Sequence, residues 1–222
     1  FTKVYVEEKD REVYVWLDLS QKMYFGTKGV LKSVAAAKTA ALIGWLSLSY
    51  KDRFGLALYT GAQTYLFDAK RVQEHFLSVL KKIENVSKEG LRTIKETQPV
   101  QKSFQLLQKK APRNAVIFLV GTFSSLADKD LNLVSSLMQT NEVYMADIYD
   151  SLEAFSPPPG EYLAEFEKQT ALIENHDPKY ELTYESYFEN KRRILKDFCL
   201  KHNAHYRPIR SDLPIYQQLR PI

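Results

Sequence analysis

Short apolar runs alternate with longer segments of helical periodicity along most of this chain. Six runs are rich in β-branched, aromatic or leucine residues and predict strands at residues 13–17, 53–59, 64–67, 115–120, 143–148 and 204–209. Segments with apolar residues three and four positions apart predict helices at residues 28–50, 72–83, 99–107, 131–138, 180–200 and 214–219. This alternation is typical of an α/β fold: a doubly wound, Rossmann-like, mostly parallel sheet of about six strands with helices on both faces.

Three local features refine this expectation. Only a tight turn at residues 60–62 precedes the run at 64–67, so we expect that run to form an antiparallel edge strand. The proline-rich break at 157–160 precedes a β-hairpin at 161–174, centred on Glu167 and Lys168, which would be an addition on the rim. Within the helix at 28–50, an apolar stripe typical of one helix face consists of Val30, Val34, Ala37, Ala41 and Trp45.

Composition supports one globular domain over residues 1–222. Hydrophobic residues make up 45% of the chain and aromatic residues 13%, enough to build a core. The net charge of +4 is too slight to indicate a dedicated nucleic-acid or membrane surface. The densest basic cluster, residues 191–193 with Lys196, is interpreted as the solvated face of a helix, and we expect no nucleic-acid partner. A weak nucleic-acid binder that uses this cluster is kept as an alternative.

Other features of the sequence bear on the cellular location of the domain and on whether it is part of a longer protein. The single cysteine, Cys199, forms no intrachain disulfide and lies in an apolar helical pattern, so we expect a buried structural thiol. No apolar run is long enough to span a bilayer and no signal peptide is visible, so we expect a cytoplasmic domain. Residues 1–9 predict a short extended segment, and the chain opens at Phe1 without methionine. We therefore expect a fragment whose parent protein can carry membrane segments.

Candidate chemistry gathers at two strand ends. In a parallel sheet, ligands bind at the carboxyl ends of the strands where the strand order reverses, which here selects the loops after Leu17 and after Val120. The first loop reads Asp-Leu-Ser-Gln-Lys-Met-Tyr-Phe-Gly over residues 18–26, and the second reads Gly-Thr-Phe over residues 121–123.

The first loop resembles the metal-site loop of von Willebrand factor A domains, in which Asp-x-Ser-x-Ser follows the first strand. More specifically, the chain is similar to the bacterial family called domain of unknown function 58. The similarity continues in Asp-Arg-Phe-Gly-Leu at residues 52–56 and in Asp-Ser-Leu-Glu at 150–153, followed by a proline and Gly160. It also includes residues 187–193 and Ser-Asp-Leu at 211–213, so it spans nearly the whole chain.

The resemblance implies a magnesium site whose pattern this chain does not complete. The family pattern supplies one Asp and two Ser from the first loop, a Thr from a later loop and an Asp after the fourth strand, as oxygen ligands for Mg²⁺. Asp18 and Ser20 match, Lys22 replaces the second Ser, Thr122 replaces the second Asp, and Thr97 is a candidate for the threonine. We therefore expect a degenerate metal-ion-dependent adhesion site with no metal and no cofactor. Lys22 either pairs with Asp18 where the metal would sit or points into solvent.

Other chemistries have little support in the sequence. No phosphate-binding Gly-rich loop and no Gly-x-Ser-x-Gly nucleophile elbow occurs. His202 and His205 lack a cysteine or carboxylate at ligand spacing, so exposed or core histidines are the better interpretation. A hydrolase that uses a Ser20 and Lys22 pair in the crevice remains an alternative.

The favoured function is therefore a protein-interaction module that is not an enzyme. The resemblance implies a MoxR-type AAA+ ATPase as partner, with the chain as partner or adaptor in assembling or maturing other proteins. We expect an exposed aromatic surface at the crevice, since such side chains often anchor partners. The candidate partner-binding residues are Asp18, Ser20, Lys22, Tyr24, Phe25, Thr122 and Phe123.

Overall fold

The computed structural model describes residues 10–90, 96–166, 169–175 and 178–219, and its main sheet has the predicted architecture. Six strands have the order β3-β2-β1-β4-β5-β8. They are β1 (Glu12–Asp18), β2 (Arg53–Tyr59), β3 (Thr64–Lys70), β4 (Val116–Gly121), β5 (Glu142–Tyr149) and β8 (His205–Arg210). All neighbours are parallel except β2 and β3, which confirms the antiparallel edge strand.

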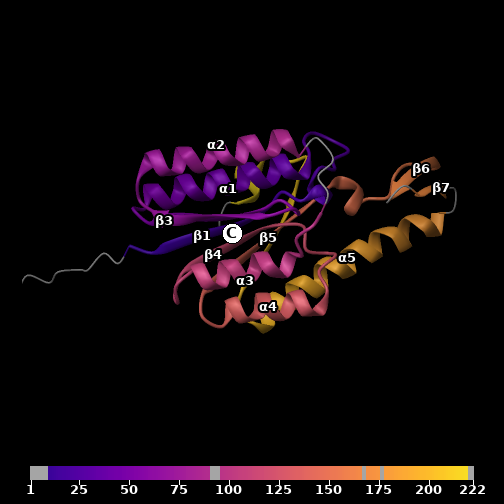
Figure 1. Cartoon of the computed structure of the whole chain (residues 1–222). Helices are drawn as coiled ribbons and strands as arrows, with labels where there is room; N and C mark the ends of the chain where they lie inside the picture. The colour runs from indigo at the N-terminus through magenta and orange to yellow at the C-terminus, as the bar shows by residue number, and fades with distance from the viewer. Residues whose placement is uncertain (1–9, 91–95, 167–168, 176–177, 220–222) are drawn as a thin grey trace, which may run out of the picture.

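Helices cover both faces of the sheet, as Figure 1 shows. One layer holds α1 (Lys32–Ser49), α2 (Gln73–Glu89) and the short α6 (Ile215–Gln218). The other holds α3 (Val100–Lys110), α4 (Asp128–Met138) and α5 (Pro178–Lys201). β1 is buried along nearly its whole length because it lies centrally between both layers, and its apolar side chains alternate between the two hydrophobic clusters.

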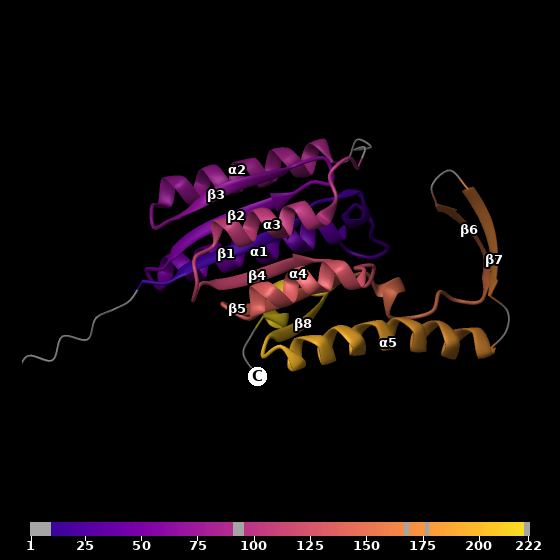
Figure 2. The same ribbon diagram turned by 60° about the horizontal axis from the view of Figure 1, so that its bottom comes forward.

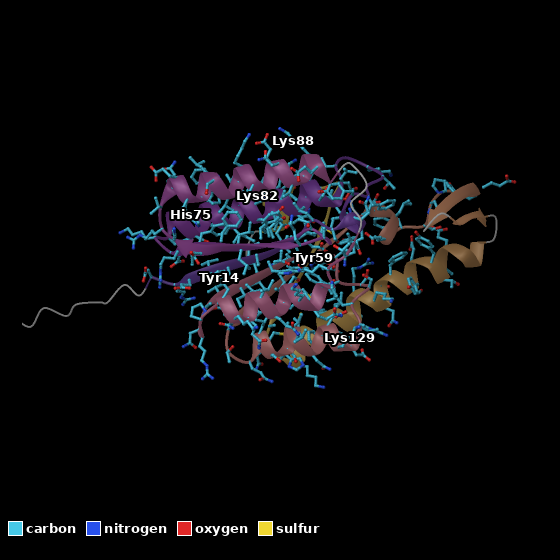
Figure 3. The ribbon with its side chains drawn as sticks, in the orientation of Figure 1. Tyr14, Tyr59, His75, Lys82, Lys88 and Lys129 are labelled. Carbon is cyan, nitrogen blue, oxygen red and sulfur yellow. The ribbon has the colours of Figure 1, made fainter. Side chains whose placement is uncertain are left out.

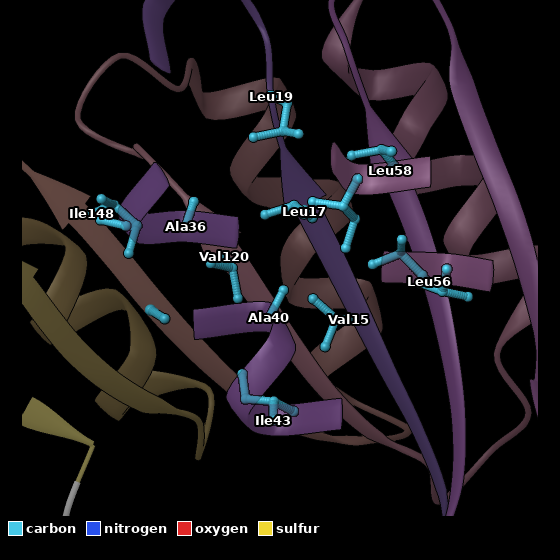
Figure 4. Close-up of a cluster of buried hydrophobic side chains, with 14 of the residues drawn as sticks. Val15, Leu17, Leu19, Ala36, Ala40, Ile43, Leu56, Leu58, Val120 and Ile148 are labelled. Atoms are coloured by element: carbon cyan, nitrogen blue, oxygen red, sulfur yellow. The ribbon is translucent and has the colours of Figure 1, made fainter. Parts of the chain in front are cut away.

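Helix α1 lies on the sheet with a face of mostly small residues. Ala36 and Ala40 approach Val15 and Leu17 of β1 in the buried cluster of Figure 4. A Cβ atom added at Gly44 would come within 2.2 Å of the Phe76 ring, so α2 also packs closely against this helix. The buried residues of α1 are Lys32, Ser33, Ala35, Ala36, Thr39, Ala40, Ile43, Gly44 and Ser47.

The apolar stripe noted in the sequence is therefore not the face that lies on the sheet. Trp45 is 46% exposed, and Ala37 and Ala41 are only half-buried. Leu46, beside Trp45, is also exposed. The helix itself is confirmed, but with apolar residues on two faces its periodicity does not say which face lies on the sheet.

The hairpin expected at residues 161–174 is present as β6 (Gly160–Phe166) paired antiparallel with β7 (Gln169–Asn175). Figure 2 shows it standing apart from the main sheet, beside the N-terminal half of α5. Its centre at residues 167–168 and the extended segment expected at 1–9 lie outside the described residues.

Several helix boundaries differ from the sequence expectation. α1 begins at Lys32 rather than residue 28, since residues 24–31 form a loop. α2 continues to Glu89, six residues beyond the expected end at residue 83. α4 begins at Asp128, and the Asp130 carboxylate accepts the Ala127 N–H at 2.9 Å, which satisfies an otherwise unpaired donor at the helix start.

Two 3₁₀ turns follow strand ends on the same side of the sheet. The first, η1 (Gln21–Met23), follows β1, and the second, η2 (Ser151–Glu153), follows β5. Met23 is buried and anchors the first turn. Both turns place polar side chains beyond the carboxyl ends of the strands.

Candidate functional site

The loops after β1 and β4 meet because these strands are neighbours. Leu17 pairs with Val120 in parallel register, so Asp18 lies at the carboxyl end of a central strand beside the end of β4, as expected. Gly121 makes this approach possible: a Cβ atom there would lie 2.7 Å from the Asp18 Cβ, closer than side chains tolerate.

The Asp18 carboxylate is buried and has few donors. Its Oδ1 accepts the Ser20 N–H at 2.9 Å, while its Oδ2 accepts no hydrogen bond from the described residues. The Lys22 ammonium lies 3.5 Å from Oδ2 and 3.5 Å from the Thr122 carbonyl oxygen. Lys22 is one third exposed, so it covers the carboxylate from the solvent side. Of the two arrangements expected for Lys22, the structure has the one beside Asp18.

Ser20 and Lys22 line a surface pocket of about 480 Å³. Thr97 lines the same pocket, but its Oγ1 donates to the Ala62 carbonyl at 3.3 Å. Tyr59 (Figure 3) forms another wall, and its hydroxyl donates to the Gln98 carbonyl at 2.7 Å. Burial raises the pKa of Tyr59, with nearby carboxylates adding to the effect, so the phenol stays neutral. The pocket therefore brings together Ser20, Thr97 and Lys22, while the Asp18 carboxylate is buried behind Lys22.

The three candidate aromatics behave differently. Phe123 was a candidate for the aromatic surface at the crevice, but it belongs to the core instead: it is 1% exposed, and its ring centroid lies 6.0 Å from that of Trp16. Tyr24 is half-buried and donates to the Val86 carbonyl at 3.3 Å. Burial raises the pKa of Tyr24 to about 12. Phe25 is 44% exposed and is the aromatic that the loop presents to solvent.

The residues present do not fit a magnesium ion. A hard divalent cation prefers about six oxygen ligands. Asp18 supplies a buried carboxylate, but an ammonium already lies 3.5 Å from its Oδ2, and Glu96 is the acidic residue among the described ones that line the pocket. Among the described residues, no group of three or more His, Cys, Asp or Glu is arranged to hold a metal.

The crevice also lacks the geometry of an activated nucleophile. Ser20 Oγ is buried and has no hydrogen-bond partner among the described residues. The lysine that could act as its base is directed to Asp18 and the Thr122 carbonyl instead. A nucleophile and its base need hydrogen-bond contact, so a Ser20 and Lys22 pair is not formed in this structure.

Sequence reasoning missed a second buried carboxylate, Asp150, at the end of β5. It accepts hydrogen bonds from the Thr27 N–H at 2.9 Å, the Thr27 hydroxyl at 2.5 Å, the Leu152 N–H at 3.0 Å and the Ser211 hydroxyl at 3.4 Å. Burial alone would raise the pKa of Asp150, but these hydrogen bonds outweigh it and hold the pKa below its ordinary value. Asp150 thus fastens loop 24–31 and the segment after β8 to the end of β5.

A third missed carboxylate, Asp147, supports the loop after β4. It accepts the Phe123 N–H at 3.1 Å and the Tyr206 hydroxyl at 2.8 Å. Burial raises the pKa of Asp147 despite these bonds. Cys199 is fully buried, as predicted, and burial together with Asp147 raises the pKa of its thiol to about 12. A thiol so rarely ionised is a poor nucleophile.

The remaining candidates take part in ordinary packing. Lys191 donates to the Ser124 carbonyl at 3.3 Å, and Arg192 donates to the Glu153 carbonyl at 2.5 Å, so part of the basic cluster contacts the protein itself. His205 stacks on Tyr144 with ring centroids 4.4 Å apart, and His202 lies against Phe198. No helix in the described part of the chain is long and apolar enough to cross a membrane.

The sequence matches one protein family, and the fold is similar to that of solved structures. The family described as "Protein of unknown function DUF58" matches residues 1–193. A conserved hypothetical protein, BatB from Bacteroides thetaiotaomicron, has a similar structure, with a TM-score of 0.57, 12% identity and coverage of 94% of this chain and 93% of that one. An aerotolerance-related membrane protein from Bacteroides fragilis NCTC 9343, solved with multiple mutations to serines, gives 0.56 at 13% identity, covering 94% of each chain. At this identity the likeness supports the fold alone. No curated protein matched the sequence.

Proposed function

The chain belongs to the family described as protein of unknown function DUF58, and on this premise we propose that it is a non-catalytic, von Willebrand factor A-like module that binds a protein partner at its strand-end crevice. The crevice does so without a metal ion. The observation that best supports this proposal is the position of the Lys22 ammonium, 3.5 Å from the buried Asp18 carboxylate. The resemblance to von Willebrand factor A domains implies a metal ion beside this carboxylate.

The electrostatics of the crevice support this proposal. A buried carboxylate without a cation is costly, and Lys22 supplies one from within the chain. Two unit charges of like sign about 4 Å apart repel by roughly 4 kcal/mol at an effective dielectric constant of 20. A metal ion would have to displace Lys22 or bear this repulsion, at a loss of about three powers of ten in affinity.

The loop after β1 offers two features that suit a protein partner. Phe25 presents an exposed ring, 5.8 Å from the Lys32 ammonium, and Lys22 lines the pocket that also contains Thr97. An exposed aromatic side chain is a common anchor for partners. The resemblance to the family leads us to propose a MoxR-type AAA+ ATPase as the partner, with this domain as its adaptor.

Capture of a purified MoxR-type ATPase from the same bacterium tests this proposal. We expect Phe25→Ala and Lys22→Gln each to weaken capture about tenfold, as loss of an interface anchor does. Leu77→Ala is the matched control, because Leu77 is 48% exposed on α2 and lines neither the crevice nor its pocket. Equal capture by all these variants, or no capture by the native domain, would contradict the proposal.

A further inference from the structure

The outer face of α1 and the segment that follows β8 enclose an apolar groove of about 600 Å³, which we call the α1 groove. Its main apolar walls are Leu42 and Trp45 on one side and Leu213, Pro214 and Tyr216 on the other. Trp45, Leu213 and Tyr216 are 46%, 42% and 57% exposed. The groove is therefore an apolar surface open to solvent.

The distribution of residues on α1 shows that its exposed apolar side chains form a continuous surface rather than isolated positions. A helix on the outside of a domain normally turns large apolar side chains inward and charged ones outward. Here the inward face is mostly Ala, Thr, Gly and Ser, while Leu42, Trp45 and Leu46 lie on the outer or lateral faces. Lys32 and Lys38 are the charged residues of the helix, and Lys32 is buried in an ion pair with Glu153. Contiguous apolar surface of this kind marks an interaction site.

The charges in the groove indicate what it would bind. Lys38 lines the groove and is exposed, and it has no ion-pair or hydrogen-bond partner among the described residues. Asp212, which lines the opposite wall, is already paired with Arg210 at 2.6 Å. The groove thus combines apolar walls with one unused positive charge.

We infer that the α1 groove binds a peptide segment of a partner protein in which an acidic side chain lies beside aliphatic or aromatic ones. The apolar side chains enter between Trp45 and Tyr216, and the carboxylate pairs with the Lys38 ammonium. A lipid surface fits less well, because anionic membranes are bound by clusters of cations and Lys38 is the one basic residue among the described residues that line the groove. A symmetric pair of grooves would supply no free carboxylate for either Lys38.

This inference rests on the proposed function, since it names a second contact surface of the same interaction module. A displayed library of random peptides of about twelve residues, selected on the purified domain, tests it without knowledge of the partner. We expect enriched peptides to share Asp or Glu next to aliphatic or aromatic residues. Lys38→Glu should weaken their binding about tenfold or more. Peptides in which Lys replaces the acidic residue should regain binding to Lys38→Glu.

Matched controls separate this charge effect from others. Lys102→Glu on α3 makes the same change in net charge far from the groove and should leave binding unchanged. Tyr216→Ala should weaken binding without harm to the fold, since that side chain is mostly exposed. Trp45→Ala is less suitable alone because its ring packs edge-on against Phe76 at 5.1 Å.

Three results would overturn the inference: enriched peptides without a shared acidic residue, binding that is indifferent to Lys38→Glu, or self-association of the domain that Tyr216→Ala abolishes. The crevice experiment is independent of these outcomes. If Phe25→Ala and Lys22→Gln weaken ATPase capture while the library yields no acidic peptides, the proposed function stands and the groove inference fails. If neither surface affects any binding, both fail.

Discussion

Asp18 and Asp150 are both fully buried aspartates at or just beyond the carboxyl ends of parallel strands, yet their surroundings differ. Asp150 receives four hydrogen bonds from neutral groups on three separate segments. Among the described residues, Asp18 receives one hydrogen bond, from the Ser20 N–H, and lies 3.5 Å from the Lys22 ammonium. One carboxylate is satisfied by dipoles and the other by an internal cation.

This difference in surroundings suggests a structural role for Asp150 and a binding role for Asp18. A carboxylate held by several oriented donors needs no cation, and its partners are fixed by the fold. The Asp18 Oδ2 accepts no hydrogen bond from the described residues and lies beside one partly exposed lysine, which another cation or a partner group could replace. The end of β5 therefore holds the loops together, and the end of β1 is where the proposed partner would bind.

Removal of the Asp150 carboxylate should have the largest effect on stability. Asp150→Ala would leave the donors of Thr27, Leu152 and Ser211 without their acceptor in a buried site. Charged hydrogen bonds contribute about 1.5–3 kcal/mol each, so we expect a loss of about 4 kcal/mol in the free energy of unfolding. Denaturant titration followed by circular dichroism measures it. Asp68→Ala, which removes an exposed carboxylate paired with Lys110, should cost less than about 1 kcal/mol.

Asp150 should also make the free energy of unfolding fall at acidic pH. Because its folded-state pKa lies below its ordinary value of 3.8, its stabilisation is present above about pH 4 and is lost as pH falls through the folded pKa. Asp150→Asn should flatten this acid limb of the stability curve. A variant that keeps the full acid limb would show that other carboxylates carry it.

Crowding at the end of β1 should have the next largest effect. Gly121→Ala would place a Cβ atom 2.7 Å from the Asp18 Cβ and 3.1 Å from the Trp16 ring. Overpacking between buried groups typically costs about 1–3 kcal/mol, and we expect about 2.5 kcal/mol here. Gly160→Ala is the control, since a Cβ there meets the Tyr162 ring at an ordinary 3.6 Å. Equal stability of the two variants would mean that β1 and β4 do not approach as described.

Loss of the internal cation should cost somewhat less. Lys22→Met removes the charge paired with Asp18 and keeps most of the side-chain volume. An unpaired buried charge is strongly destabilising, but Lys22 is one third exposed and water can enter in its place. We therefore expect a loss of about 2 kcal/mol, which denaturant unfolding measures. Asp18→Asn in the Lys22→Met background should restore part of it, and a Lys22→Met domain as stable as the native one would contradict the pairing.

The sequence predicted the sheet better than the sites, for identifiable reasons. Each strand and its turn are encoded by neighbouring residues, so local pattern sufficed for all six strands. Asp18, Ser20 and Lys22 were found because they follow one strand within five positions. Asp150 was missed as a hub because Thr27 and Ser211 lie 123 and 61 positions away.

The aromatic candidates show a second limit of local pattern. Phe123 continues past the end of β4, and nothing near it in sequence reveals that it packs against Trp16 from β1. On α1, both faces are apolar, so periodicity gave a stripe without saying which neighbour covers it. Burial at such positions depends on contacts between distant segments, which a single sequence does not display.

The smallest expected effect on stability is that of magnesium, and it tests whether Asp18 differs from Asp150 in its ability to bind a cation. If Lys22 takes the cation position, magnesium should not stabilise the native domain, whereas Lys22→Ser with Thr122→Asp would remove the ammonium and add a second carboxylate beside Asp18. Magnesium prefers such oxygen ligands, so this double variant should bind it. At about ten times its dissociation constant, the ion should raise the free energy of unfolding by about 1.4 kcal/mol, which thermal unfolding with and without magnesium detects. Calcium-free buffer and an Asp18→Ala version of the double variant are the controls. If magnesium stabilised the native domain and Asp18→Ala abolished this effect, the ion would be displacing Lys22 from Asp18. The proposal that the crevice works without a metal would then be wrong.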